Sequence, residues 1–232
     1  MEQAKAEVLR YLGYRNQKLS PELDGIIEEC MRIMRETVSP FQTRMTFDIR
    51  VQTDGIHLEN TGITLPGTDI RRHLDGCNQA VLLAVTLGTA ADSLIRHWEA
   101  ADITRSLVLD ACATQYIEQL CDELEKQVRQ EASDRGLAIT PRFSPGYGDL
   151  PLDTQPKLLA VLDAGRRIGL TCTERFILIP RKSVTALIGL GKELHERPGG
   201  CDSCPLQSTC GFTKGKRNCG YTGIDPKQNS AL

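Results

Sequence analysis

Four cysteines lie close together near the end of the 232-residue sequence: Cys201, Cys204, Cys210 and Cys219. The gap of two residues between the first pair lets both thiolates reach one metal ion, and four thiolates suit either structural zinc or an iron–sulfur cluster. The remaining gaps are too irregular for a familiar zinc finger, and Lys214, Lys216 and Arg217 would offset the negative charge of a cluster. We therefore expect these four cysteines to bind a metal or cluster. An iron–sulfur cluster, zinc, and a tail with a disulfide or without metal remain open.

The second feature that could carry out chemistry is a carboxylate within an apolar helix face. At 100° per residue, the predicted helix 103–131 gathers apolar side chains on one face: Ile103, Leu107, Ile117, Cys121, Leu124 and Val128. Asp110, Thr114 and Glu118 lie within the same face. A buried carboxylate is costly unless it meets a cation or hydrogen-bond donors. We interpret Asp110 as structural. For Glu118, an ion pair with an arginine and a pocket for a positively charged ligand both remain open.

The third feature is the loop Arg142-Phe143-Ser144-Pro145-Gly146-Tyr147-Gly148-Asp149. The central Pro-Gly predicts a type II turn, in which glycine takes a positive φ and the chain presents backbone N–H and C=O groups. The guanidinium of Arg142 can bind a carboxylate through two parallel hydrogen bonds, although it can also pair with Asp149. Tyr147 either packs against a ligand or belongs to the core.

The hydrophobic pattern predicts the elements that position these residues. Residues 21–37 have helical spacing after Ser20-Pro21, and residues 45–51 alternate as a half-buried strand before a hairpin turn at Asp54-Gly55. We expect further elements in this order: a buried strand over 79–87, the helix 103–131, a helix over 154–168 capped by Asp153 and ended by Gly169, and strands over 176–179 and 184–190.

The composition is that of an ordinary globular protein, with 40% hydrophobic and 25% charged residues. The net charge of −2 argues against nucleic-acid binding through bulk charge. No apolar run is long enough for a membrane span, and the first thirty residues hold several charges and no apolar signal segment. We therefore expect a cytoplasmic protein that binds neither nucleic acid nor membranes. The odd total of nine cysteines also disfavours a disulfide framework.

Three segments together resemble the activation domain of cobalamin-dependent methionine synthase: Arg142-x-x-Pro145-Gly146-Tyr147, Leu170-Thr171-x-Thr173-Glu174-x-Phe176 and Pro180-x-x-Ser183-Val184. Glu118 lies on a helix before the loop, as an inward glutamate does in that family. The resemblance covers residues 103–188, extends plausibly from about residue 43, and is absent from the tail. The sequence contains no methyltransferase barrel and no cobalamin-binding module, so it resembles a free-standing version of the domain.

The resemblance implies an α+β fold: a single curved domain with a twisted, mainly antiparallel sheet and packed helices, followed by a small Cys-rich tail. We expect an N-terminal helical segment over 1–42, a domain that binds S-adenosylmethionine over 43–195, and a metal-binding tail over 196–232. The ligand-binding residues implied are Glu118, Arg142, Ser144, Pro145, Gly146 and Tyr147. The segment after Leu190 lacks the tyrosine that the family pattern leads us to expect, and no N-terminal acid can be assigned to the site.

The implied function is reactivation of a methionine synthase that lacks its own activation domain. In the family, S-adenosylmethionine methylates the cobalamin of the synthase after one-electron reduction of inactive Co(II). The cobalamin belongs to the partner protein, and a flavodoxin or ferredoxin would supply the electron. Two alternatives remain: reactivation of another corrinoid protein with the help of a tail iron–sulfur cluster, and a non-catalytic interaction module stabilised by zinc.

Overall fold

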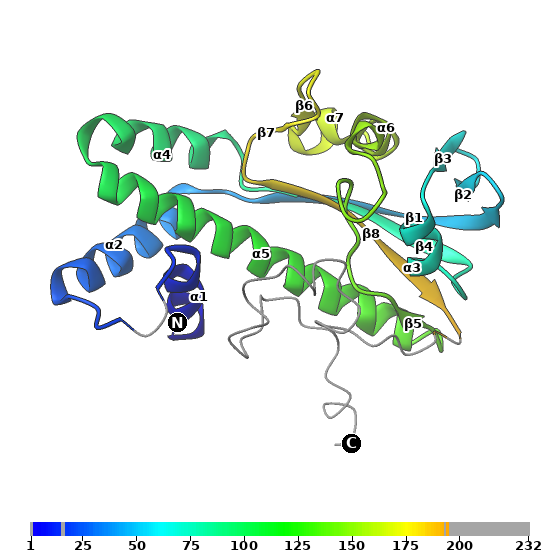
Figure 1. Cartoon of the computed structure of the whole chain (residues 1–232), viewed down its shortest axis with the longest axis horizontal. Helices are drawn as coiled ribbons and strands as arrows, with labels where there is room; N and C mark the ends of the chain where they lie inside the picture. Colours follow the sequence, from blue (N-terminus) through cyan, green and yellow to red (C-terminus); the bar gives the residue numbers. More distant parts are fainter. Residues whose placement is uncertain (1, 15–16, 193, 195–232) are drawn as a thin grey trace. The chain divides into compact units, whose positions relative to one another are not determined.

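A six-stranded antiparallel sheet forms the centre of the protein (Figure 1). The computed structural model describes residues 2–14, 17–192 and 194. The strands follow the order β3-β2-β1-β4-β8-β5. Their bounds are β1 Phe41–Gln52, β2 Gly55–Leu58, β3 Ile63–Leu65, β4 Gln79–Thr86, β5 Ala138–Ile139 and β8 Ser183–Gly191. The β1–β2 hairpin and the strands predicted over 45–51, 79–87 and 184–190 are confirmed.

The central strand β4 is buried on both faces of the sheet, because helices or loops cover each one. Val81, Leu83 and Val85 belong to a large apolar core on one face. Leu82 and Ala84, which alternate with them, are fully buried on the other. Alternation of side chains across a strand therefore gives this sheet two apolar layers rather than one.

Three helices lie on the first face of the sheet: α1 Glu2–Tyr11, α2 Pro21–Thr37 and α5 Ile103–Ser133. A fourth helix, α4 Thr89–Ala101, packs against α5 beside the end of β4 (Figure 1). Ser20 caps α2 as predicted, because its hydroxyl accepts a hydrogen bond from the backbone N–H of Leu23 at 3.2 Å. Asp102 caps the long helix α5 by accepting from the N–H groups of Thr104 and Arg105. Buried residues of α1, α2, α4 and α5 share one core with the sheet.

The predicted apolar face of α5 is wrong in its first two turns. Ile103 and Leu107 are 62% and 59% exposed, whereas Val108, Leu109 and Cys112 are buried. The buried face shifts there because α2 and α4 pack against the side of the helix that carries these three residues. From Ile117 onward the predicted face is buried as expected.

Smaller elements cover the second face of the sheet: α3 Thr68–His73, η1 Leu152–Thr154, α6 Gln155–Val161, α7 Ala164–Ile168, β6 Thr171–Cys172 and β7 Leu178–Ile179. The helix predicted over 154–168 is two helices, because Asp163 adopts a left-handed conformation with φ 51°. Gly169 ends the second helix as expected, but Asp153 caps neither. The strand expected over 176–179 shortens to β7, which pairs with β6.

Candidate functional site

Arg142 lies three residues after β5 and reaches three carboxylates on α5. Its Nη2 donates to Asp122 Oδ1 at 2.8 Å and to Glu118 Oε2 at 3.3 Å. Its Nη1 lies 3.8 Å from Glu125 Oε2. The spacing of four and seven residues brings these acids onto one side of the helix. The structure thus joins Glu118 and Arg142, which the sequence singled out separately, and adds Asp122 and Glu125, which it did not.

The electrostatics of this cluster are unbalanced. Three carboxylates surround one guanidinium whose side chain is only 19% exposed. Burial raises the pKa of Glu118, and the positive charge of Arg142 opposes that shift. Arg142 Nη1 is buried, and it has no hydrogen-bond partner in the described part of the chain. The cluster can therefore accept a cationic group beside the acids and offer a donor to an anionic group.

The chain between Ser144 and Tyr147 forms the predicted turn. The N–H of Tyr147 donates to Ser144 O at 3.0 Å, and Gly146 has φ 90°, as a type II turn requires. Among the described residues, the carbonyl groups of Pro145 and Gly146 accept no hydrogen bond from a backbone N–H. Pro145 is buried, whereas Tyr147 is 54% exposed and lies edge-on to Phe143. Tyr147 is thus not a core ring.

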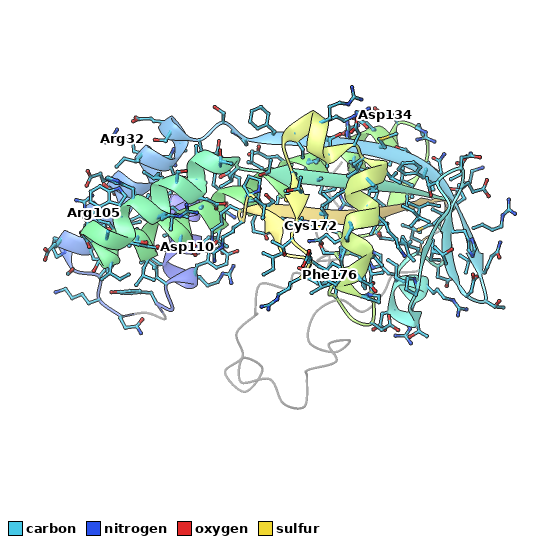
Figure 2. The ribbon with its side chains drawn as sticks, turned by 90° about the horizontal axis from the view of Figure 1, so that it is seen from above. Arg32, Arg105, Asp110, Asp134, Cys172 and Phe176 are labelled. Atoms are coloured by element: carbon cyan, nitrogen blue, oxygen red, sulfur yellow. The ribbon has the colours of Figure 1, made fainter. Side chains whose placement is uncertain are left out.

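Asp110 and Thr114 bind a different cation from Glu118. Lys182 Nζ lies 2.9 Å from Asp110 Oδ1 and donates to Thr114 Oγ1 at 2.9 Å. This ion pair supports the structural interpretation of Asp110. Figure 2 shows Asp110 near Arg105, at the end of the molecule opposite Asp134. No local signal in the sequence pointed to Lys182, because the residues that it binds lie about seventy positions earlier.

Asp149 does not pair with Arg142, which was the alternative left open by the sequence. Its carboxylate instead accepts hydrogen bonds from the first residues of α3. These bonds lower the pKa of Asp149, with the hydroxyl of Thr68 contributing most. Arg142 therefore pairs with the acidic residues of α5 and not with Asp149.

The family model for the activation domain of vitamin B12 dependent methionine synthase matches residues 70–195, more than half of the chain. The chain belongs to this family. The activation-domain match includes Glu118, Arg142 and the Ser144–Tyr147 turn. The chain is also similar to a solved structure of the MetH reactivation domain bound to AdoHcy, with 17% identity and a TM-score of 0.58. That similarity covers 81% of this chain and 70% of the other, and it confirms the expected α+β fold. No curated protein matches the sequence.

The cysteine-rich tail, residues 196–232, lies outside the described residues, and so do the four predicted metal ligands in it. Within the described part of the chain, no three His, Cys, Asp or Glu side chains are grouped to hold a metal ion. The described helices include none that is both long and apolar enough to cross a membrane.

Proposed function

We propose that this activation-domain protein binds S-adenosylmethionine between α5 and the 142–147 loop. The observation that carries the proposal is the buried Nη1 of Arg142, which lacks a hydrogen-bond partner among the described residues, while Nη2 of the same guanidinium contacts Glu118. S-adenosylmethionine has a carboxylate for such a donor and two positive groups, an ammonium and a sulfonium, for the acids. The structural relative binds AdoHcy, the demethylated form of the same molecule, which supports this ligand class.

Each residue of the proposed site has a distinct role. Arg142 binds the ligand carboxylate, while Asp122 and Glu125 keep the guanidinium in place on α5. Glu118 offsets the ligand's positive charge. The carbonyl groups of Pro145 and Gly146 accept from an amino group of the ligand, Ser144 supplies a polar side chain, and Tyr147 packs its exposed ring against the ligand.

We further propose that the bound ligand serves the cobalamin of a partner methionine synthase that lacks its own activation domain. The sulfonium supplies the methyl group, a flavodoxin or ferredoxin supplies one electron, and S-adenosylhomocysteine is released. The family match supports a synthase as partner. Another corrinoid methyltransferase protein is the alternative, and assays with both partners in the Co(II) form distinguish them.

The domain boundaries and the tail belong to the same proposal. Residues 43–195 carry the ligand site, residues 1–42 add two helices that pack on α5, and residues 196–232 bind a metal centre. Four cysteines within a short basic segment support an iron–sulfur cluster or zinc. A cluster would favour electron delivery to the corrinoid, whereas zinc without reactivation activity would indicate an interaction module.

Calorimetric titration with S-adenosylmethionine tests the ligand site. The wild-type protein should bind, and Arg142→Ala should weaken binding by about 2–5 kcal/mol, the cost of removing one partner of a buried charged pair. Arg44→Ala is the matched control, because Arg44 also binds an acid of α5, Glu131, but outside the proposed site. Absence of binding in the wild type, or equal affinity in Arg142→Ala, would refute the proposal.

A further inference from the structure

The short helix α3 holds the 141–149 loop at both of its ends. At the start, His73 Nε2 and the carbonyl oxygen of Pro141 are 2.9 Å apart, and the His73 ring lies 4.8 Å from that of Phe143. At the end, Asp149 Oδ2 accepts from the N–H and hydroxyl of Thr68 at 2.6 and 2.7 Å. Asp149 Oδ1 accepts from the N–H of Asp69 at 2.9 Å. The loop that carries Arg142 and Tyr147 is thus tied to one element more than sixty residues earlier.

Two glycines permit the close approach of this loop to α3. A Cβ on Gly67 would lie 2.5 Å from Asp149 Oδ1, and a Cβ on Gly148 would collide with the carboxylate of Asp69. Both glycines have positive φ, 122° and 51°. A side chain at either position would therefore push the loop away from the helix. The close contact thus depends on a glycine on each side, Gly67 before α3 and Gly148 in the loop.

The helix is a firm support because it is anchored in the second apolar layer. Ile70 of α3 and Leu74, which follows it, are fully buried. Leu74 lies against β8 at Gly189, where an added Cβ would be only 2.7 Å from its side chain. The start of the loop is fixed to the same strand, because Thr140 Oγ1 accepts from the N–H of Gly189 at 2.8 Å. Helix, strand and loop therefore form one connected unit.

We infer that Asp149 is a positioning residue for the ligand site, which fixes the 144–148 turn so that Arg142 and Tyr147 meet the ligand together. Asp149 is exposed and lies at the far end of the turn, so it acts through the backbone of the loop. Without its three hydrogen bonds, the loop would keep its links to β8 at Phe143 and to His73 at its start, but its far end would lose its tie to α3. Ligand binding would then have to order the turn, and that entropic cost lowers affinity. This inference rests on the proposed S-adenosylmethionine site.

The experiment measures S-adenosylhomocysteine binding and hydrogen exchange of the 142–149 segment in the full-length protein. Asp149→Ala should weaken binding about tenfold, equivalent to about 1.4 kcal/mol at 25 °C, and should speed exchange in that segment. Asp149→Asn keeps only one of the two acceptor oxygens and turns an NH2 donor toward the other α3 N–H, so its affinity should lie between those of Asp149→Ala and the wild type. Gly67→Ala should reproduce the loss. Gly62→Ala should not, because Gly62 shares a positive φ but has no atom within 4 Å of the added Cβ.

Asp102→Ala is the control for a general loss of stability, because Asp102 caps α5 in the same way but lies far along that helix from Glu118. Wild-type affinity in Asp149→Ala, with unchanged loop exchange, would overturn the inference while leaving the binding proposal intact. An equal loss in Asp102→Ala would also overturn it, because the effect would then come from global destabilisation. Failure of the wild type to bind would instead refute the proposed function.

Discussion

Replacing Arg142 by alanine should destabilise the folded protein even without ligand. Among the described residues, the substitution removes the cation that pairs with Glu118 and Asp122. Glu125 keeps its ion pair with Arg129, whose Nη2 lies 3.1 Å from Glu125 Oε1. Three carboxylates on one side of α5 would then repel one another with less compensation. Burial would also raise the pKa of Glu118 further once the opposing charge of Arg142 is gone.

The magnitude follows from the exposure of the four side chains. Asp122 and Glu118 are 61% and 45% exposed, and exposed pairs contribute only about 0.2–1 kcal/mol. Arg142 and Glu125 are 19% and 20% exposed, and breaking a buried pair costs about 3–5 kcal/mol. The cluster lies between these limits, so we expect a loss of about 2 kcal/mol. For a protein of this size, that lowers Tm by about 4–8 °C.

Thermal and urea unfolding at pH 7 and at about pH 5 would measure this loss. The attraction to Arg142 requires ionised carboxylates, so its contribution is present above their pKa values and falls as the pH is lowered through them. Because the pKa of Glu118 is raised, its share is lost first, and the difference between wild type and Arg142→Ala should shrink toward pH 5. Arg44→Ala, which breaks a single pair with the exposed Glu131, should cost less than about 1 kcal/mol. A difference below that of Arg44→Ala, or one that grows as the pH falls, would refute the reasoning.

Three further predictions concern other sites. Glu118→Gln should weaken S-adenosylmethionine more than the neutral S-adenosylhomocysteine in parallel titrations, because only the former carries a sulfonium; equal losses would make Glu118 structural. Burial raises the pKa of Cys30 to about 11 and of Cys112 and Cys121 to about 12. Alkylation at pH 8, mapped by mass spectrometry, should therefore spare these thiols until the protein is unfolded. Rapid alkylation of the folded protein at these cysteines would contradict this. Cys201→Ser with Cys204→Ser should abolish bound iron or zinc and make the tail more sensitive to proteolysis, yet leave ligand binding intact; a metal-free wild type with a protease-resistant tail would count against a metal centre.

Local sequence determined most of the elements that carry the site. The alternation over 45–51 with Asp54-Gly55 fixed the first hairpin, since strand burial has a period of two and the turn needs specific residues. Pro145-Gly146 likewise determined the turn, because glycine alone tolerates its positive φ easily. Ser20-Pro21 marked the start of α2 for the same local reason.

The tertiary structure decided which charged residues meet and which faces are buried. The partners of Arg142 lie 17 to 24 positions earlier, and those of Asp149 lie about eighty positions earlier. The exposure of Ile103 and Leu107 depends on where α2 and α4 pack, and helical periodicity holds no information about that. Spacing identified Glu118 and Arg142 as candidates, but only the packing of the 141–149 loop between α5 and α3 placed them together, because that contact joins segments distant in sequence.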